Sequence, residues 1–227
     1  MRGKTRIFAI ITLLLACVGF GLLTDMPSYL KYKKGEIKDF ALVQPGELKT
    51  GDLVQGEIEF TEGSIAEMET SNKTFGVTTS KETTSQYYAV YMVNDQCIIY
   101  ETGNKEQWNT LDRMAKEYMQ YIQSYNDVFS ESGSNNSSDV ELPTTTMTFT
   151  GKVKEMPTDL EKIFREWYGD DAAYAKEAES VVISNMAFDN LGKLMLVGIG
   201  CAALAVVMLI VTVISLIGGK KNSQFSY

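Results

Sequence analysis

The sequence predicts an α+β protein in which two transmembrane helices flank a small β-barrel-like domain, OB-like in its order of elements, with one or two helices. Three observations carry this prediction. Two long apolar stretches without charges lie near the ends of the 227-residue chain. Short β-rich runs lie between them, and a long helical pattern interrupts these runs. The contents of 44% apolar and 22% charged residues are those of an ordinary folded chain.

The first apolar stretch, Ile7 to Leu23, has 17 residues and no charge. About 17–25 apolar residues suffice to cross the hydrocarbon core of a membrane as a helix. We therefore expect a basic cytoplasmic tail at 1–6 and a transmembrane helix at 7–24. The alternative is a signal peptide, in which a lipobox-like sequence would make Cys17 a lipidated N-terminus. The apolar stretch continues six residues past Cys17, and this favours the uncleaved anchor.

The second apolar stretch, Leu194 to Ile217, has 24 uncharged residues. It predicts a transmembrane helix at 190–218 and a tail at 219–227 that contains Lys220 and Lys221. Both tails are basic, and basic residues beside a span favour the cytoplasmic side. The sequence thus predicts a two-pass protein of the cell membrane with both termini in the cytoplasm and an extracytoplasmic central domain.

The central region is strongly acidic. All 29 acidic residues lie between Asp25 and Asp189, and 16 of the 21 basic residues lie between Lys31 and Lys193, so the region 25–193 has a net charge of −13. Such a surface repels phosphate backbones, and this excludes nucleic acid as a partner. It suits basic or polar partners instead.

The chain after the first span begins with a juxtamembrane segment at 25–36, which includes a short helix over 28–34 before Gly35. The α+β domain is expected at 37–189. Its first strands are expected at 37–43 and 51–60, and the second alternates apolar with polar residues. The polar stretch 61–86 is interpreted as an excursion or a weak strand pair.

The strongest hairpin pattern joins strands at 87–93 and 97–100 through a turn. Both strands are almost wholly apolar, and this indicates burial on both faces. A helix is expected at 104–129, with an apolar stripe that includes Trp108, Leu111 and Met114 or Ala115. A flexible loop at 130–143 follows, and it contains Asn-X-Ser sequons at Asn135 and Asn136.

The last part of the domain is expected to contain a strand at 144–156, a helix at 158–168 and a strand at 180–184. Thr158 and Glu161 match a capping box, and Gly169 stands where the helix should stop. The buried stripe of this helix is expected to comprise Leu160, Ile163, Phe164 and Trp167.

The order of strands and helix resembles that of an OB-fold, a five-stranded barrel with a helix between strands three and four. The segments GDLVQGEIEF, YYAVYMV–NDQ–CIIY and TFTGKVKEM carry the comparison. In this layout the chain resembles uncharacterised two-span membrane proteins of Gram-positive bacteria with an OB-like domain between the spans. This resemblance implies no activity, catalytic residue or cofactor.

Several kinds of chemistry are excluded by composition. The chain has no histidine and only three cysteines, so it lacks His-based catalysis, His-ligated metal and CxxC sites. Cys97, in an apolar run, is interpreted as a buried, inert thiol. The Asp170–Asp171 pair is too small for a calcium loop. No catalytic residue, metal or cofactor is predicted.

Two groups of residues are candidates for contacts. Gly198 and Ala202 form a small-xxx-small pair, and Cys17 and Gly21 form a looser one, which suits close packing of helices in lipid. If the domain is OB-like, its binding face lies near strands two and three. The tyrosines there form the candidate ligand or partner face, although core packing is the alternative: Tyr87, Tyr88, Tyr91 and Tyr100.

The function predicted from the sequence is that of a non-enzymatic, membrane-anchored binding or accessory domain outside the cytoplasm. Its expected partners are the lipid bilayer and an envelope protein or further copies of the chain. Two alternatives remain open. One is an envelope enzyme that acts on lipid or cell-wall precursors through carboxylates, and the other is a component of a homo-oligomeric channel.

Overall fold

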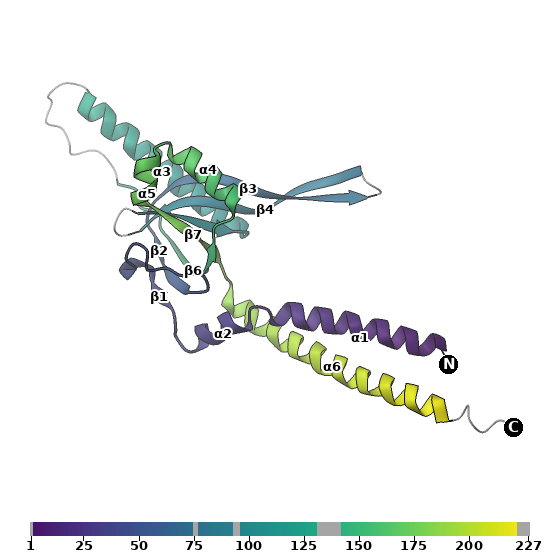
Figure 1. Ribbon diagram of the computed structural model, residues 1–227. Coiled ribbons are helices and arrows are strands. Elements are labelled where there is room, and N and C mark those ends of the chain that lie inside the picture. The colour runs from purple at the N-terminus through teal and green to yellow at the C-terminus, as the bar shows by residue number, and fades with distance from the viewer. Residues whose placement is uncertain (1, 75–76, 93–95, 131–141, 222–227) are drawn as a thin grey trace. The chain divides into compact units, whose positions relative to one another are not determined.

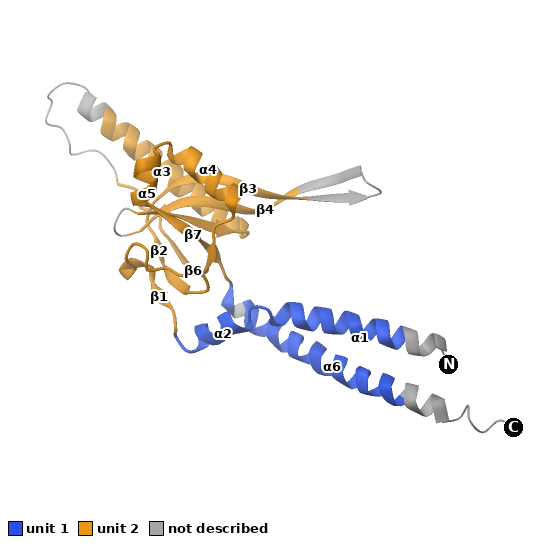
Figure 2. Cartoon of the chain, viewed as in Figure 1, with its two compact units in different colours: residues 1–35, 187–227 blue, residues 36–186 orange. Residues whose placement is uncertain are grey.

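The computed structural model describes residues 2–74, 77–92, 96–130 and 142–221. The chain divides into two compact units, which Figure 2 colours separately. Unit 1 comprises Met1–Gly35 and Ala187–Tyr227, and unit 2 comprises Glu36–Met186. The predicted hairpin turn at 94–96 and the predicted flexible loop at 130–143, with its sequons, lie largely outside the described residues.

Unit 1 is helical. It contains α1 (Arg2–Leu23), α2 (Met26–Lys33) and α6 (Phe188–Lys221). The stretches Ile7–Lys33 and Asn190–Ile214 are long and apolar enough to cross a membrane, and only 6% and 17% of their most apolar windows are buried. The helix α2 packs on α6 through the stacked rings of Tyr32 and Phe188, whose centroids are 4.4 Å apart. It begins two residues before the predicted start.

Unit 2 is an α+β domain, and Figure 1 labels its elements. Its helices are η1 (Phe40–Leu42), α3 (Lys105–Ser130), α4 (Thr158–Tyr168) and α5 (Asp171–Glu177). Its strands are β1 (Lys38–Asp39), β2 (Leu53–Ile58), β3 (Thr61–Thr74), β4 (Val77–Tyr91), β5 (Cys97–Thr102), β6 (Met147–Glu155) and β7 (Ala178–Asn185).

The seven strands of the described residues form one open mixed sheet in the order β1-β2-β6-β7-β5-β4-β3. The pairs β1–β2 and β5–β7 are parallel, and the other pairs are antiparallel. The predicted OB-like barrel is not confirmed, although α3 does lie between the fifth and sixth strands of the chain as expected. The last strand enters the middle of the sheet, between β6 and β5, and β1 and β3 remain at its two edges.

The central strands are buried on both faces, as their apolar sequence indicated. On one face, Tyr88, Ile98 and Tyr100 pack with Leu111 and Met114 of α3. On the other face, the alternate residues of β4, β5 and β7 pack with α4 and α5 in a second cluster: Tyr87, Ala89, Cys97, Ile99, Leu160, Phe164, Tyr174 and Val182. Helices therefore cover both faces of the sheet centre.

The structure shortens one predicted strand and decides between the two interpretations of the polar stretch 61–86. The expected strand at 37–43 has only two residues, because the Asp39 carboxylate accepts a hydrogen bond from the Ala41 N–H and the chain turns into η1. The polar stretch 61–86 is a long strand pair, in which β3 pairs with β4 from Thr61 to Thr74. Since β5 pairs only with Gln86–Tyr91, the far part of this pair is a two-stranded ribbon (Figure 1).

The prediction for α4 is partly wrong. Pro157 occupies the N-cap position without a side-chain cap hydrogen bond, so the expected capping box does not form. Leu160 and Phe164 are buried, but Ile163 is 41% and Trp167 37% exposed. Gly169 ends the helix in the left-handed conformation with φ 79°, as expected. Asp170 accepts hydrogen bonds from the N–H groups of Ala172 and Ala173 and so begins α5.

At Gly151 of β6, the neighbouring strand leaves no room for a side chain. A Cβ atom at Gly151 would lie 2.5 Å from Ile183 Cγ2 and 3.0 Å from the Ser184 carbonyl oxygen. Gly151 thus lets β6 pack against β7, the central strand. Ile183, whose side chain would have to shift, is fully buried.

We predict that Gly151→Ala destabilises unit 2 by about 1–3 kcal/mol, the usual range for overpacking a core. Urea unfolding followed by circular dichroism measures the effect. Thr148→Ala, on the exposed side of the same strand, serves as the control and should change the free energy of unfolding by less than about 0.5 kcal/mol. Equal effects of the two substitutions would contradict this account of the glycine.

Candidate functional site

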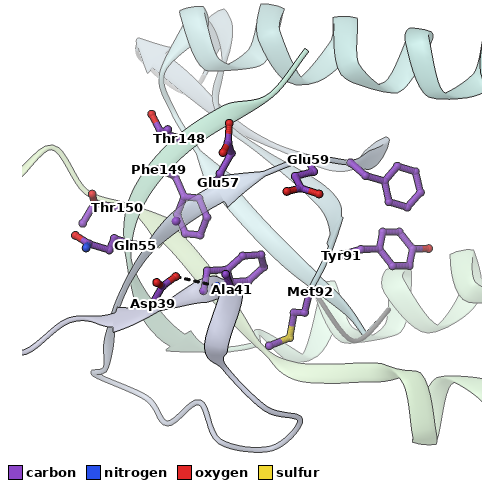
Figure 3. Close-up of a pocket in the computed structure, with 13 residues that line it drawn as sticks. Asp39, Ala41, Gln55, Glu57, Glu59, Tyr91, Met92, Thr148, Phe149 and Thr150 are labelled. Atoms are coloured by element: carbon purple, nitrogen blue, oxygen red, sulfur yellow. Dashed lines mark hydrogen bonds between the residues drawn. The ribbon is translucent and has the colours of Figure 1, made fainter. Parts of the chain in front are cut away.

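Unit 2 contains a pocket of about 820 Å³ at the β1–β2 end of the sheet (Figure 3). Strands β2 and β6 form one wall of the pocket, and η1 forms another. The end of β4 and the residues that follow β2 line the remainder. Its lining combines acidic, polar and aromatic side chains: Asp39, Phe40, Ala41, Gln55, Gly56, Glu57, Glu59, Phe60, Tyr91, Met92, Thr148, Phe149 and Thr150. We call this cavity the β2 pocket.

The charged groups of the β2 pocket are all carboxylates. Asp39, Glu57 and Glu59 line it, and no described lysine or arginine does. Asp39 accepts from the Ala41 N–H at 3.0 Å, and Glu57 accepts from the Thr146 hydroxyl. Glu59 has no hydrogen bond or ion pair with a described residue. Figure 3 shows Glu57 and Glu59 on one side of the pocket and Asp39 across from them, with Phe149 between.

Uncharged polar groups extend this acidic lining along the exposed side of the sheet. The register places Gln55 opposite Thr150 and Glu57 opposite Thr148. Among the described residues, the side chains of Gln55, Thr148 and Thr150 make no hydrogen bond. These donors and acceptors are therefore available to a bound molecule or to water.

Aromatic rings form another wall of the pocket. The ring of Phe60 stacks on Tyr91 with centroids 4.6 Å apart, and it contacts Tyr118 of α3 at 3.8 Å. The Tyr91 hydroxyl donates to Glu62 at 2.5 Å, so this ring is fixed in place at both ends. Burial raises the pKa of Tyr91, and the hydrogen bond to Glu62 adds to the shift. The phenol thus stays neutral at physiological pH.

The four tyrosines proposed from the sequence have different positions. Tyr88 and Tyr100 are fully buried, and Tyr87 is 6% exposed, so these three belong to the core. The Tyr88 hydroxyl donates to Asp112 of α3 at 2.9 Å, which ties that helix to the sheet. Only Tyr91 is half-buried and lines the pocket. The sequence could not separate these roles, because all four occur in equally apolar runs.

The acidic residues of the pocket were the part that sequence reasoning missed. The sequence places Glu57 and Glu59 on the polar side of the alternating strand at 51–60, which indicates plain solvation, and it places Asp39 within the expected strand at 37–43. The alternation of Gln55, Glu57 and Glu59 was the available signal. It showed a polar face but could not show that η1 folds beside it and turns the face into a pocket.

The chemistry of the pocket suits binding. Within the described residues, no group of three or more Cys, Asp or Glu side chains is placed to hold a metal ion. Among the described residues that line the pocket there is no lysine or cysteine. Cys97 is fully buried outside it, and burial raises the pKa of its thiol to about 12. A carboxylate-lined pocket with aromatic walls instead matches polar or cationic ligands.

The helix contact of unit 1 involves only part of the predicted set. A Cβ at Gly198 would lie 2.9 Å from Leu22 Cβ, and a Cβ at Gly19 would lie 3.0 Å from the Ala202 nitrogen. Gly198 and Ala202 thus contact α1 of the same chain, and they lie opposite Gly19. The sequence alone did not identify Gly19 as a contact residue. A Cβ at Gly21 would meet nothing within 4 Å, and Cys17 is exposed.

A comparison with protein families matches residues 2–218 to a family described as Domain of unknown function (DUF8577). The match covers both units, so the chain belongs to this family. No curated protein was found with a matching sequence.

We predict that Gly198→Val separates α1 from α6, because its methyl groups would occupy the space of Leu22. Spin labels on the native Cys17 and Cys201 report the separation in detergent, since Cys97 is buried. We expect the dipolar broadening of the spin-label spectrum to weaken, as it would if the distance between the axes of α1 and α6 increased by about 2 Å. Gly21→Val, where a Cβ meets nothing, is the control. Unchanged broadening for Gly198→Val would show that the small residue is dispensable.

We also predict a loss of stability in alkali. Burial, followed by the nearby Glu101 carboxylate, raises the pKa of Tyr87 from 10.0 to about 12. The unfolded chain therefore loses this proton first, so the associated stability is complete below pH 10 and is lost as the pH rises towards 12. Tyr87→Phe should flatten this part of the stability profile, measured by urea unfolding at increasing pH. Tyr125→Phe, at a side chain 43% exposed, should leave the profile as in the wild type.

Proposed function

We propose that the chain is a non-enzymatic binding or accessory protein of the cell membrane, in which α1 and α6 cross the bilayer and unit 2 presents a binding pocket outside the cytoplasm. The observation that carries the proposal is the combination of two exposed apolar helices with a separate folded unit that contains the β2 pocket. An envelope of the Gram-positive type, suggested by the resemblance in layout, is part of the proposal.

The helices support membrane insertion through their composition. Their exposed surface consists of large apolar side chains such as Phe20, Leu196 and Ile214, which are 80%, 72% and 64% exposed. Exposing so many apolar side chains to water is unfavourable, whereas lipid accommodates them without cost. Each helix also pairs its interior backbone N–H and C=O groups along its own length, as lipid requires.

The orientation is proposed from the charges at the two ends. Arg2, Lys4 and Arg6 precede the first span, and Lys220 and Lys221 follow the second. Basic residues close to a span are retained in the cytoplasm, so both tails should lie there. Unit 2 contains 27 acidic and 12 basic residues, a net charge of −15, and would then lie outside.

Binding is favoured over catalysis by the contents of the β2 pocket. Among the described residues, no lysine or cysteine lines the pocket beside its three carboxylates, so the usual Lys- and Cys-based nucleophile–base pairs are not formed there. The pocket instead offers unpaired acceptors beside apolar rings. Such a lining recognises a ligand by charge and shape.

The proposed topology predicts the labelling of single cysteines in intact cells. Thr144→Cys, in an exposed part of unit 2, should react with a membrane-impermeant maleimide, whereas Ser226→Cys in the C-terminal tail should react only after permeabilisation. Permeabilised cells provide the control that both thiols are reactive. Labelling of the tail but not of unit 2 in intact cells would overturn the proposed orientation.

A partner can be sought by crosslinking in cells, with purification through a tag on the C-terminus and mass spectrometry. A stoichiometric protein partner would support the accessory role. Recovery of self-crosslinked chains alone would favour the homo-oligomer instead.

A further inference from the structure

We propose that the β2 pocket binds a basic polypeptide segment, with a lysine or arginine side chain seated between the carboxylates of Glu57 and Glu59 and the ring of Tyr91. This inference rests on the proposed function and deepens it by naming the class of ligand.

The charge of the pocket favours a cation. Three carboxylates line about 820 Å³ of space, and no described basic side chain neutralises them. Other carboxylates of unit 2 do have such partners, such as Asp52 and Glu47 with Lys38, and Glu101 with Lys154. A positively charged ligand would supply the missing partner for Glu59, which has none among the described residues. The surrounding negative field of unit 2 would also speed its approach.

The aromatic wall adds selectivity for organic cations. An ammonium or guanidinium group is attracted to the face of a tyrosine or phenylalanine ring within about 6 Å of its centroid. The Phe60–Tyr91 pair borders the same space as the carboxylates, and the hydrogen bond to Glu62 holds the Tyr91 ring in position. Apolar rings also accommodate the methylene stem of a lysine or arginine, which a hydrated metal ion does not have.

The strand pairing favours a polypeptide over a free small cation. On its outer side, β2 pairs with β1 only at Val54 and Gln55, because the chain then turns into η1. No strand of the described residues pairs with the outer side of Gly56–Ile58, and Gly56 and Glu57 line the pocket. An extended segment can hydrogen-bond to such a strand edge while its alternate side chains enter a neighbouring pocket.

The test uses the full chain in a zwitterionic detergent and two fluorescein-labelled probe peptides. One has the sequence Gly-Ser-Lys-Val-Lys-Ser-Gly, and the other has both lysines replaced by glutamine. Fluorescence polarisation gives their dissociation constants. We expect the lysine peptide to bind at least about tenfold more tightly, and its affinity to fall with added salt, as for a charge-assisted contact. Equal affinities of the two peptides would overturn the proposal.

Matched variants separate the pocket from the general negative charge. The pocket variant is Glu57→Gln with Glu59→Gln. The control is Glu155→Gln with Glu166→Gln, which removes the same charge at exposed positions outside the pocket lining. We expect the pocket variant to weaken lysine-peptide binding about tenfold and the control to change it less than about twofold. An equal effect of both would show that only the overall charge attracts the peptide, and this would overturn the site.

The aromatic contribution is tested at Tyr91. Tyr91→Phe keeps the ring and should change the affinity less than about twofold, whereas Tyr91→Leu should weaken binding about fivefold. Circular dichroism verifies that each variant is folded. If Tyr91→Leu binds as the wild type does, the ring is not part of the site, and the proposed seat of the cation is wrong.

The inference and the proposed function can fail separately. The peptide measurements use purified protein and do not depend on its orientation in the cell. If maleimide labelling placed unit 2 in the cytoplasm while the pocket still selected the lysine peptide, the proposed function would fail and the inference would stand. If labelling placed unit 2 outside while the two peptides bound equally, the inference alone would fail.

Discussion

The pairing of β7 between β5 and β6 is the constraint on which the rest of unit 2 depends. Ile183 and Val182 of this strand face opposite sides of the sheet and belong to the two separate core clusters. A strand with two apolar faces has to be covered on both, and α3 and α4–α5 provide the two covers. The buried Glu179 carboxylate at the start of β7 accepts from the Gly46 N–H at 2.6 Å and ties the loop before β2 to this centre. Gly151 then lets β6 approach closely enough to extend the sheet towards β2.

This arrangement leaves the β2–β6 end of the sheet with a different surface. Its buried side joins the α3-facing cluster through Val54, Ile58 and Phe149, but its other side has the exposed residues Gln55, Glu57 and Thr148. The two-residue β1 gives this edge little cover, because Asp39 turns the chain into η1. Because β1 is so short, the sheet ends in a polar surface that lies beside this edge strand and an aromatic pair. It is also the place where a ligand would find unpaired polar groups.

The helices of unit 1 follow a different physical rule. In the proposed membrane-spanning arrangement, lipid removes the hydrophobic drive for helix association, so close backbone packing would be the main source of contact energy. Gly19 and Gly198 provide that proximity, because any larger side chain would meet backbone or the Leu22 side chain. The juxtamembrane α2 adds a second attachment through Tyr29, whose hydroxyl oxygen would lie 2.7 Å from a Cβ at Gly192, and through the stacking of Tyr32 on Phe188.

The sequence by itself determined the features that depend on local pattern. Runs of apolar residues gave the two end helices, period-two alternation gave β2 and β6, and the unbroken apolar runs of β4 and β5 indicated burial on both faces. The tertiary structure alone decided what depends on partners distant in the chain. The OB-like order did not imply a barrel, since only the strand order, with β1 and β3 at its two ends, shows that the sheet stays open. Packing between elements also decided three details that no local periodicity records. Ile163 is exposed, and the glycine of α1 that contacts α6 is Gly19 and not Gly21. Asp39 lines the same pocket as Glu57 and Glu59.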